Sequence, residues 1–149
     1  MTVPPCGMAA PIPPTHRLWR SAKDHPDWHT WDADSLCWLP DGYALRFNPE
    51  WSVSWAEHLE GVHKLTSEAA TGVGHPVVYE ATVQGALGLG MSVVHTPQGN
   101  TPVICAHTSV HYTEDATPPP SRRKELRTGL ARRLVRVQGS VTLPPPRGA

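Results

Sequence analysis

Residues 76–83, PVVYEATV, carry the clearest structural signal in this 149-residue chain. Their side chains alternate between two sets. Val77, Tyr79, Ala81 and Val83 would point to one side, and Val78, Glu80, Thr82 and Gln84 to the other. This period of two is typical of a β-strand with one wetter face. We therefore predict a strand here, in a sheet whose other members must come from the neighbouring sequence.

The stretch that follows, SVVHTPQGNTPVICAHTSVHY at 92–112, predicts a hairpin. One strand would begin at about Ser92 and the next would run from about Val103 to Tyr112. Between them TPQGNTP has the residues of a turn, although it is longer than the tightest hairpin loops. About three mostly antiparallel strands result.

Two segments predict helices. Ser54-Trp55-Ala56-Glu57 fits the Ser-x-x-Glu capping box, so we expect a helix over about 55–65 with Trp55, Leu59 and Val62 buried. Ser121 would cap a second helix, whose leucines recur every fourth residue on a surface rich in arginine. Together these elements predict a small α+β domain.

The two ends of the chain differ from its centre in composition. Residues 1–14 and the C-terminal segment VTLPPPRGA are rich in proline, which disfavours both helices and central strands. We expect a flexible arm at 1–14, a single domain at 15–138 and a flexible tail at 139–149. No run is apolar enough to cross a bilayer, and the start lacks the features of a signal peptide. These patterns predict a cytoplasmic protein with no membrane contact.

The formal charge is zero, but the charges are unevenly placed. Seven basic residues and only one acid, Glu125, lie between Ser121 and Arg136. Such a segment can attract nucleic acid, an acidic protein partner, or the acidic remainder of the chain itself. Because the charge wraps most of the helix outside the leucines, nucleic-acid binding would be nonspecific and would use Arg122, Arg123, Lys124, Arg127, Arg132 and Arg133.

All six tryptophans fall between Trp19 and Trp55. One interpretation is base stacking in a nucleic-acid groove. The other, which we favour, is that these rings fill the core of a domain poor in Phe and Leu.

Three histidines gather on the predicted hairpin. If 103–112 is one strand, Cys105, His107, Ser109 and His111 share a face next to His95 of the neighbouring strand. His95 and His107 would then be an acid/base pair, with Asn100 in the turn and Ser54 or Ser109 assisting. The alternative is that His95 and His107 fix the hairpin through hydrogen bonds.

The same face limits what a metal could use. His111 lies too far from His107 to share an ion, which leaves Cys105, His107 and His95 as the feasible ligands. No short ligand spacing accompanies them, so we expect neither metal nor cofactor. The three cysteines form no CxxC pair, and we expect free thiols.

The order of these motifs resembles a group of small, uncharacterised bacterial proteins. They share a Leu-Ser-Val-like element before a helix, a His/Asp-x-Pro…Asn-x-x-His-Ala/Ser-x-Val segment and a basic helix near the end. The matching positions lie within about residues 45–134: Ser52, Val53, Ser54, His95, Pro97, Asn100, His107 and Val110. The resemblance implies a bacterial, cytoplasmic setting in defence or on a mobile element.

These observations favour a binding or accessory module that contacts nucleic acid or a protein partner through its basic C-terminal helix. One alternative is a small phosphodiesterase or nuclease-like enzyme using His95 and His107, with or without a metal. Another is an antitoxin or immunity protein that only binds. The sequence does not predict an oligomeric state.

Overall fold

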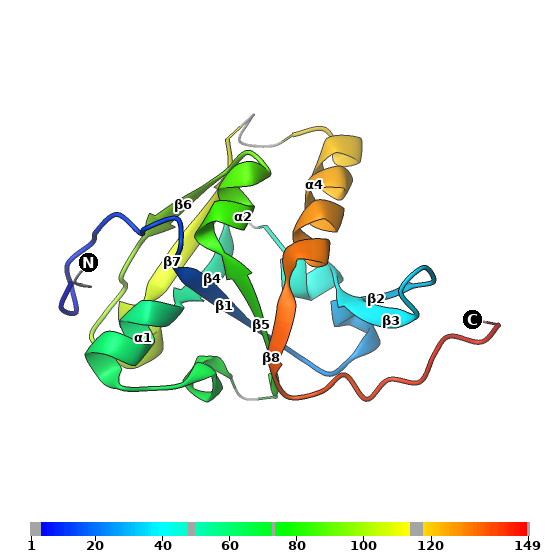
Figure 1. Cartoon of the computed structure of the whole chain (residues 1–149), viewed down its shortest axis with the longest axis horizontal. Coiled ribbons are helices and arrows are strands. Elements are labelled where there is room, and N and C mark those ends of the chain that lie inside the picture. The colour runs from blue at the N-terminus through cyan, green and yellow to red at the C-terminus, as the bar shows by residue number, and fades with distance from the viewer. Residues whose placement is uncertain (1–3, 48–49, 73, 114–117, 149) are drawn as a thin grey trace.

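A six-stranded antiparallel sheet forms the centre of the molecule, as the computed structural model shows for residues 4–47, 50–72, 74–113 and 118–148 (Figure 1). The strands lie in the order β6-β7-β4-β1-β5-β8. Their bounds are β1 Arg17–Ala22, β4 Trp51–Trp55, β5 Val77–Thr82, β6 Met91–His95, β7 His107–Tyr112 and β8 Val135–Gln138. A separate hairpin pairs β2 His29–Asp32 with β3 Cys37–Pro40. The α+β class is confirmed, but the expected number of strands, about three, is wrong.

Helices cover both faces of this sheet. On one side lie α4 Pro120–Arg133 and α2 Val83–Gly88, and on the other α1 Ala56–His63 (Figure 1). Shorter turns are α3 Pro102–Cys105, η1 Pro26–Trp28, η2 Gly42–Leu45 and η3 Ser67–Ala70. No described helix is long and apolar enough to cross a membrane.

The core divides into two clusters because the sheet is buried on both faces. The larger cluster lies under α4 and includes Leu18, Trp51, Val77, Leu126 and Leu130. The smaller lies under α1 and contains Trp19, Trp55, Leu59, Ala70, Val78, Ala56 and Ala106. The alternation predicted for PVVYEATV is confirmed, since Val77, Tyr79, Ala81 and Val83 all belong to the larger cluster.

The six tryptophans form a buried group and a partly exposed group. Trp19, Trp51 and Trp55 are buried, which confirms the core interpretation for these three. Trp28, Trp31 and Trp38 are partly exposed on η1 and the β2–β3 hairpin.

Several boundaries differ from the sequence-based prediction for local reasons. Trp55, not Ser54, precedes α1, and Glu57 accepts hydrogen bonds from the backbone N–H and Nε of Arg17 instead of closing a capping box. Pro119 precedes α4, not Ser121, because Pro120 occupies the first turn, where its missing N–H costs nothing. The sequence after Leu134 leaves the helix and becomes edge strand β8.

The strand predicted over 103–112 is shorter than expected. Pro102 begins a helical turn, in which the backbone N–H of Cys105 donates to Thr101 O at 2.7 Å. The strand starts only at His107. The assumption that Cys105, His107, Ser109 and His111 alternate along one strand is therefore wrong for Cys105.

Candidate functional sites

The two histidines predicted as an acid/base pair are both held by hydrogen bonds. His95 is 3% exposed, and its Nε2 lies 2.8 Å from the carbonyl oxygen of Cys105. Nδ1 of His107 lies 3.0 Å from Thr96 O and 2.9 Å from Thr96 Oγ1. Both contacts tie β6, β7 and the loop between them together. The geometry thus favours the structural alternative for this pair.

The remaining polar residues of the predicted hairpin site lie apart from one another. Asn100 is exposed in the loop, and its carbonyl oxygen lies 3.8 Å from Cys6 Sγ. Ser54 is buried in β4, and buried Ser109 has its hydroxyl 2.7 Å from that of Thr96. His111 lies 3.8 Å from a carboxylate oxygen of Glu50, toward the end of the β6–β7 hairpin that is farther from the loop. His95, His107 and Asn100 therefore do not converge on a common open space.

A different cluster of thiols and imidazoles forms where the N-terminal arm meets α1. Cys6 and Cys105 form a disulfide across 99 positions of sequence, with their Cα atoms 5.3 Å apart. The expectation of free thiols is therefore wrong for these two cysteines, and only Cys37 is free among those described. The bond fastens the described part of the arm, residues 4–14, to the end of α3.

Three histidines surround this disulfide. Nε2 of His63 lies 3.3 Å from Cys6 Sγ, and Nε2 of His58 lies 3.8 Å from Cys105 Sγ. The ring of His95 is centred 5.2 Å from that of His58. Burial lowers the pKa of His58 to about 4, and electrostatic repulsion from the neighbouring His95 and His63 acts in the same direction. Burial likewise lowers the pKa of His95. Both rings are therefore neutral near pH 7.

Sequence reasoning missed this cluster for two reasons. His58 lies on α1 and His63 at its end, with four residues between them. Neither histidine has a cysteine near it in the sequence at a spacing typical of metal ligands. Cys6 stands in a proline-rich arm that carries no signal of where it docks. His58 is fully buried, although it does not belong to the apolar stripe predicted for this helix.

The basic helix α4 presents cations to solvent, as the sequence predicts. Lys124, Arg132 and Arg133 are exposed, whereas Arg122, Arg123 and Arg127 are partly buried beside the leucine stripe. Arg122 pairs with Glu125 at 2.8 Å. In the described part of the chain no carboxylate lies within ion-pair distance of Lys124, Arg132 or Arg133. Lys124 and Arg133 are therefore not docked on the acidic remainder of the protein, whereas Arg132 lines a hollow together with Asp32 and Asp41. The charge of Arg132 adds to the hydrogen bond from Ser35 in lowering the pKa of Asp32.

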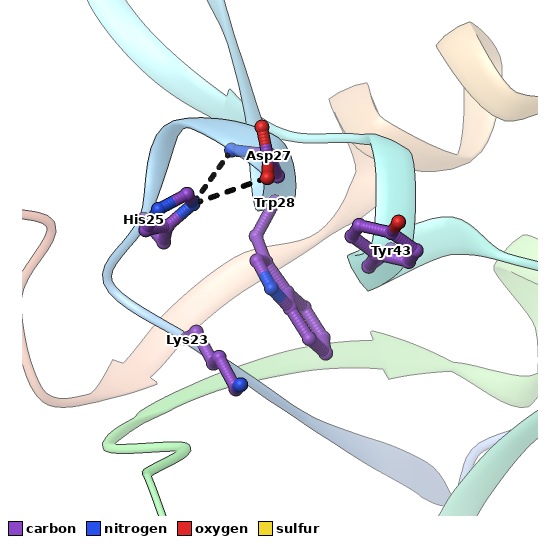
Figure 2. Close-up of a pocket in the computed structure, with 5 residues that line it drawn as sticks. All are labelled: Lys23, His25, Asp27, Trp28 and Tyr43. Carbon is purple, nitrogen blue, oxygen red and sulfur yellow. Dashed lines mark hydrogen bonds and ion pairs between the residues drawn. The ribbon is translucent and has the colours of Figure 1, made fainter.

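A hollow of about 390 Å³ lies at the end of β1 and is lined by Lys23, His25, Asp27, Trp28 and Tyr43 (Figure 2). The Trp28 ring stands beside Tyr43, with their centroids 5.7 Å apart. His25 turns to its own loop, where Nδ1 accepts from the backbone N–H of Asp27 at 3.1 Å. The hollow offers an aromatic wall and one lysine, but its histidine is already hydrogen-bonded.

No protein-family model matches this chain, and comparison with curated proteins and with solved structures gives no match either.

Proposed function

We propose that this protein is a small nucleic-acid-binding module whose cationic face on α4 contacts the phosphate backbone. The cationic face is defined as Lys124, Arg132 and Arg133. The observation that carries the proposal is that these three side chains are exposed and that, among the described residues, no carboxylate lies within ion-pair distance of them. Self-docking on an acidic surface would have paired them, and in the described part of the chain only Arg132 lies near carboxylates, those of Asp32 and Asp41.

The shape of the face suits nonspecific contact. Lys124 and Arg133 are nine positions apart, so the three charges extend about 14 Å along the helix axis and spread over roughly half of its circumference. A strand of B-form DNA carries one phosphate per ~3.4 Å of axis, so this length is comparable to about four phosphates. Exposed arginine and lysine contact phosphates regardless of base, which gives affinity without sequence preference.

The histidines have a supporting role in this proposal. Because His95 and His107 are hydrogen-bonded to backbone at the β6–β7 loop, they hold the hairpin rather than face a ligand. We therefore favour binding over the phosphodiesterase alternative. A defence or mobile-element setting is compatible with a nonspecific binder.

Removing the cationic face should weaken binding on the order of 10²-fold at 0.1 M salt. The variant is Lys124→Gln, Arg132→Gln, Arg133→Gln in one chain. Each phosphate contact contributes about 0.9 to the slope of log K against log salt, so the slope should fall by about 3. Fluorescence anisotropy with a mixed-sequence DNA duplex, a single strand and an RNA hairpin, each titrated with salt, measures both quantities.

The matched control removes the same charge elsewhere. Lys64, Arg46 and Arg147 are exposed outside α4, and their triple replacement by glutamine should leave most of the affinity and slope intact. His107→Ala should also bind normally. The proposal is wrong if the natural chain binds none of the three probes, or if the control variant loses as much affinity as the α4 variant.

A further inference from the structure

The cluster beneath the N-terminal arm brings together the ligand types that zinc prefers. Sγ of Cys6, Nε2 of His63 and Sγ of Cys105 all lie within 4.8 Å of one another. They come from three separate segments: the arm, α1 and the end of α3. Figure 1 shows the arm on the same side of the molecule as α1. Thiolate and imidazole ligands in this combination are typical of tetrahedral zinc sites.

We propose that Cys6, Cys105 and His63, with His58 as the fourth ligand, bind one zinc ion when the disulfide is reduced. The protein would thus fasten its arm in two ways, by a disulfide under oxidising conditions and by a metal under reducing ones. This inference is independent of the α4 surface.

The spacing suits Cys6, Cys105 and His63, whereas His58 lies outside that group and must move toward it. Zn–S bonds of ~2.3 Å and Zn–N bonds of ~2.0 to 2.1 Å imply separations around a tetrahedral ion of about 3.3 Å between nitrogens, about 3.6 Å between nitrogen and sulfur and about 3.8 Å between sulfurs. His63 Nε2 is 3.3 Å from Cys6 Sγ, and His58 Nε2 is 3.8 Å from Cys105 Sγ. The two sulfurs, once unbonded, must separate to about 3.8 Å, which rotation of the Cys6 side chain on its exposed arm permits.

The surroundings also suit a metal. His58 is fully buried next to Cys105, and an imidazole nitrogen is a common zinc ligand. Nδ1 of His95, buried beside it, has no hydrogen-bond partner in the described structure. Cys6 and His63 are partly exposed and provide an entry path.

The change of state balances as ordinary thiol chemistry. Two molecules of a small thiol reduce the Cys6–Cys105 bond, and their sulfurs are oxidised to a disulfide of their own. The two protein sulfurs receive the electron pair and two protons. Zinc binding then releases those protons to solvent as the thiols become thiolates.

Cobalt(II) substitution tests the site in the full chain. The protein is reduced with dithiothreitol, freed of reductant without oxygen, and titrated with Co²⁺ alone. We expect one equivalent per chain with a thiolate-to-cobalt charge-transfer band, and displacement by Zn²⁺. The oxidised chain should give no such band, because its sulfurs are bonded to each other.

Variants assign the ligands. Cys6→Ser, on the arm and outside the core, should fold normally and lose the charge-transfer intensity of one thiolate with at least ~10-fold weaker binding. His63→Ala should weaken binding at least as much as loss of a residue that merely orients a ligand, ~10-fold to 100-fold. Cys37→Ser, the matched cysteine control, should bind as the natural chain does. The proposal fails if the folded, reduced chain gives no thiolate band, or if Cys37→Ser abolishes it.

Discussion

Replacing Trp51 by alanine should lower the free energy of unfolding by about 3 to 5 kcal/mol, the range typical of a large aromatic removed from a core. Trp51 is 0% exposed in β4, opposite Val110 of β7, and packs against the ring of Phe47. Its indole N–H also donates to Ala44 O at 2.8 Å, which ties η2 to the sheet. Since small domains have about 5 to 15 kcal/mol in total, the variant should be close to unfolded at 37 °C. Urea unfolding followed by circular dichroism measures the loss.

Two variants separate the contributions at this position. Trp51→Phe keeps most of the ring but removes the indole donor; because Ala44 O still accepts from Arg20 Nε, the loss should be about 0.5 to 1.5 kcal/mol, the net contribution of one hydrogen bond. Trp28→Ala removes a tryptophan that lines the hollow at the surface and should cost less than half as much as Trp51→Ala. Equal losses for Trp51→Ala and Trp28→Ala would contradict the assignment of Trp51 to the core.

The sequence predicts an element well where the cause of that element is local. The alternation of 76–83 depends only on the strand's own residues and emerges with the expected inward set in β5. The leucine stripe of α4 is equally local, and Leu126 and Leu130 are buried as expected. Solvent exposure of the cationic face follows from the same periodicity.

The tryptophan-rich half shows where local patterns are insufficient. Strands β1 and β4 lie in the middle of the sheet and are buried on both faces, so they lack the alternation of apolar and polar residues that reveals a half-buried strand. Arg20 in β1 also conceals its position, because its guanidinium donates to carbonyl oxygens of Ala44, Ser52 and Tyr43 rather than to an acid. A charged residue usually indicates a loop or an exposed position, so Arg20 does not suggest a central strand unless its three carbonyl partners are known.

The Cys/His cluster was unpredictable for another physical reason. Its members are brought together by tertiary docking of the arm, a contact across 99 positions that no spacing rule records. The hairpin histidines, by contrast, were found because they are close in sequence. His95 and His107 are close in the sequence, whereas the cysteine and histidines around Cys105 are brought together only by folding.

Lowering the pH from 7 to 5 should destabilise the protein, in part through His29. This side chain is buried, its Nδ1 donates to His25 O at 3.1 Å, and its Nε2 accepts from the hydroxyl of Tyr79 at 2.8 Å. Burial lowers the pKa of His29 below 6.5, the value we take for the unfolded chain. The unfolded state therefore binds a proton first as the pH falls, and stability decreases below about pH 6.5 by at most ~1.4 kcal/mol per pH unit for this group.

Urea unfolding of the natural chain at pH 7, 6 and 5 measures this dependence, and His29→Gln isolates its origin. Glutamine retains an amide that can bond the Tyr79 hydroxyl but does not titrate in this range, so the variant should lose less stability between pH 7 and 5 than the natural chain. His111→Gln is the control, because His111 is partly exposed and lies 3.8 Å from a carboxylate oxygen of Glu50. Tyr79→Phe should destabilise the protein at pH 7 by about 1 to 3 kcal/mol, because it leaves the buried Nε2 of His29 without a donor. If the His29→Gln and natural curves run parallel, the proton that destabilises the fold is taken up elsewhere, and the buried His29–Tyr79 pair is not part of the acid response.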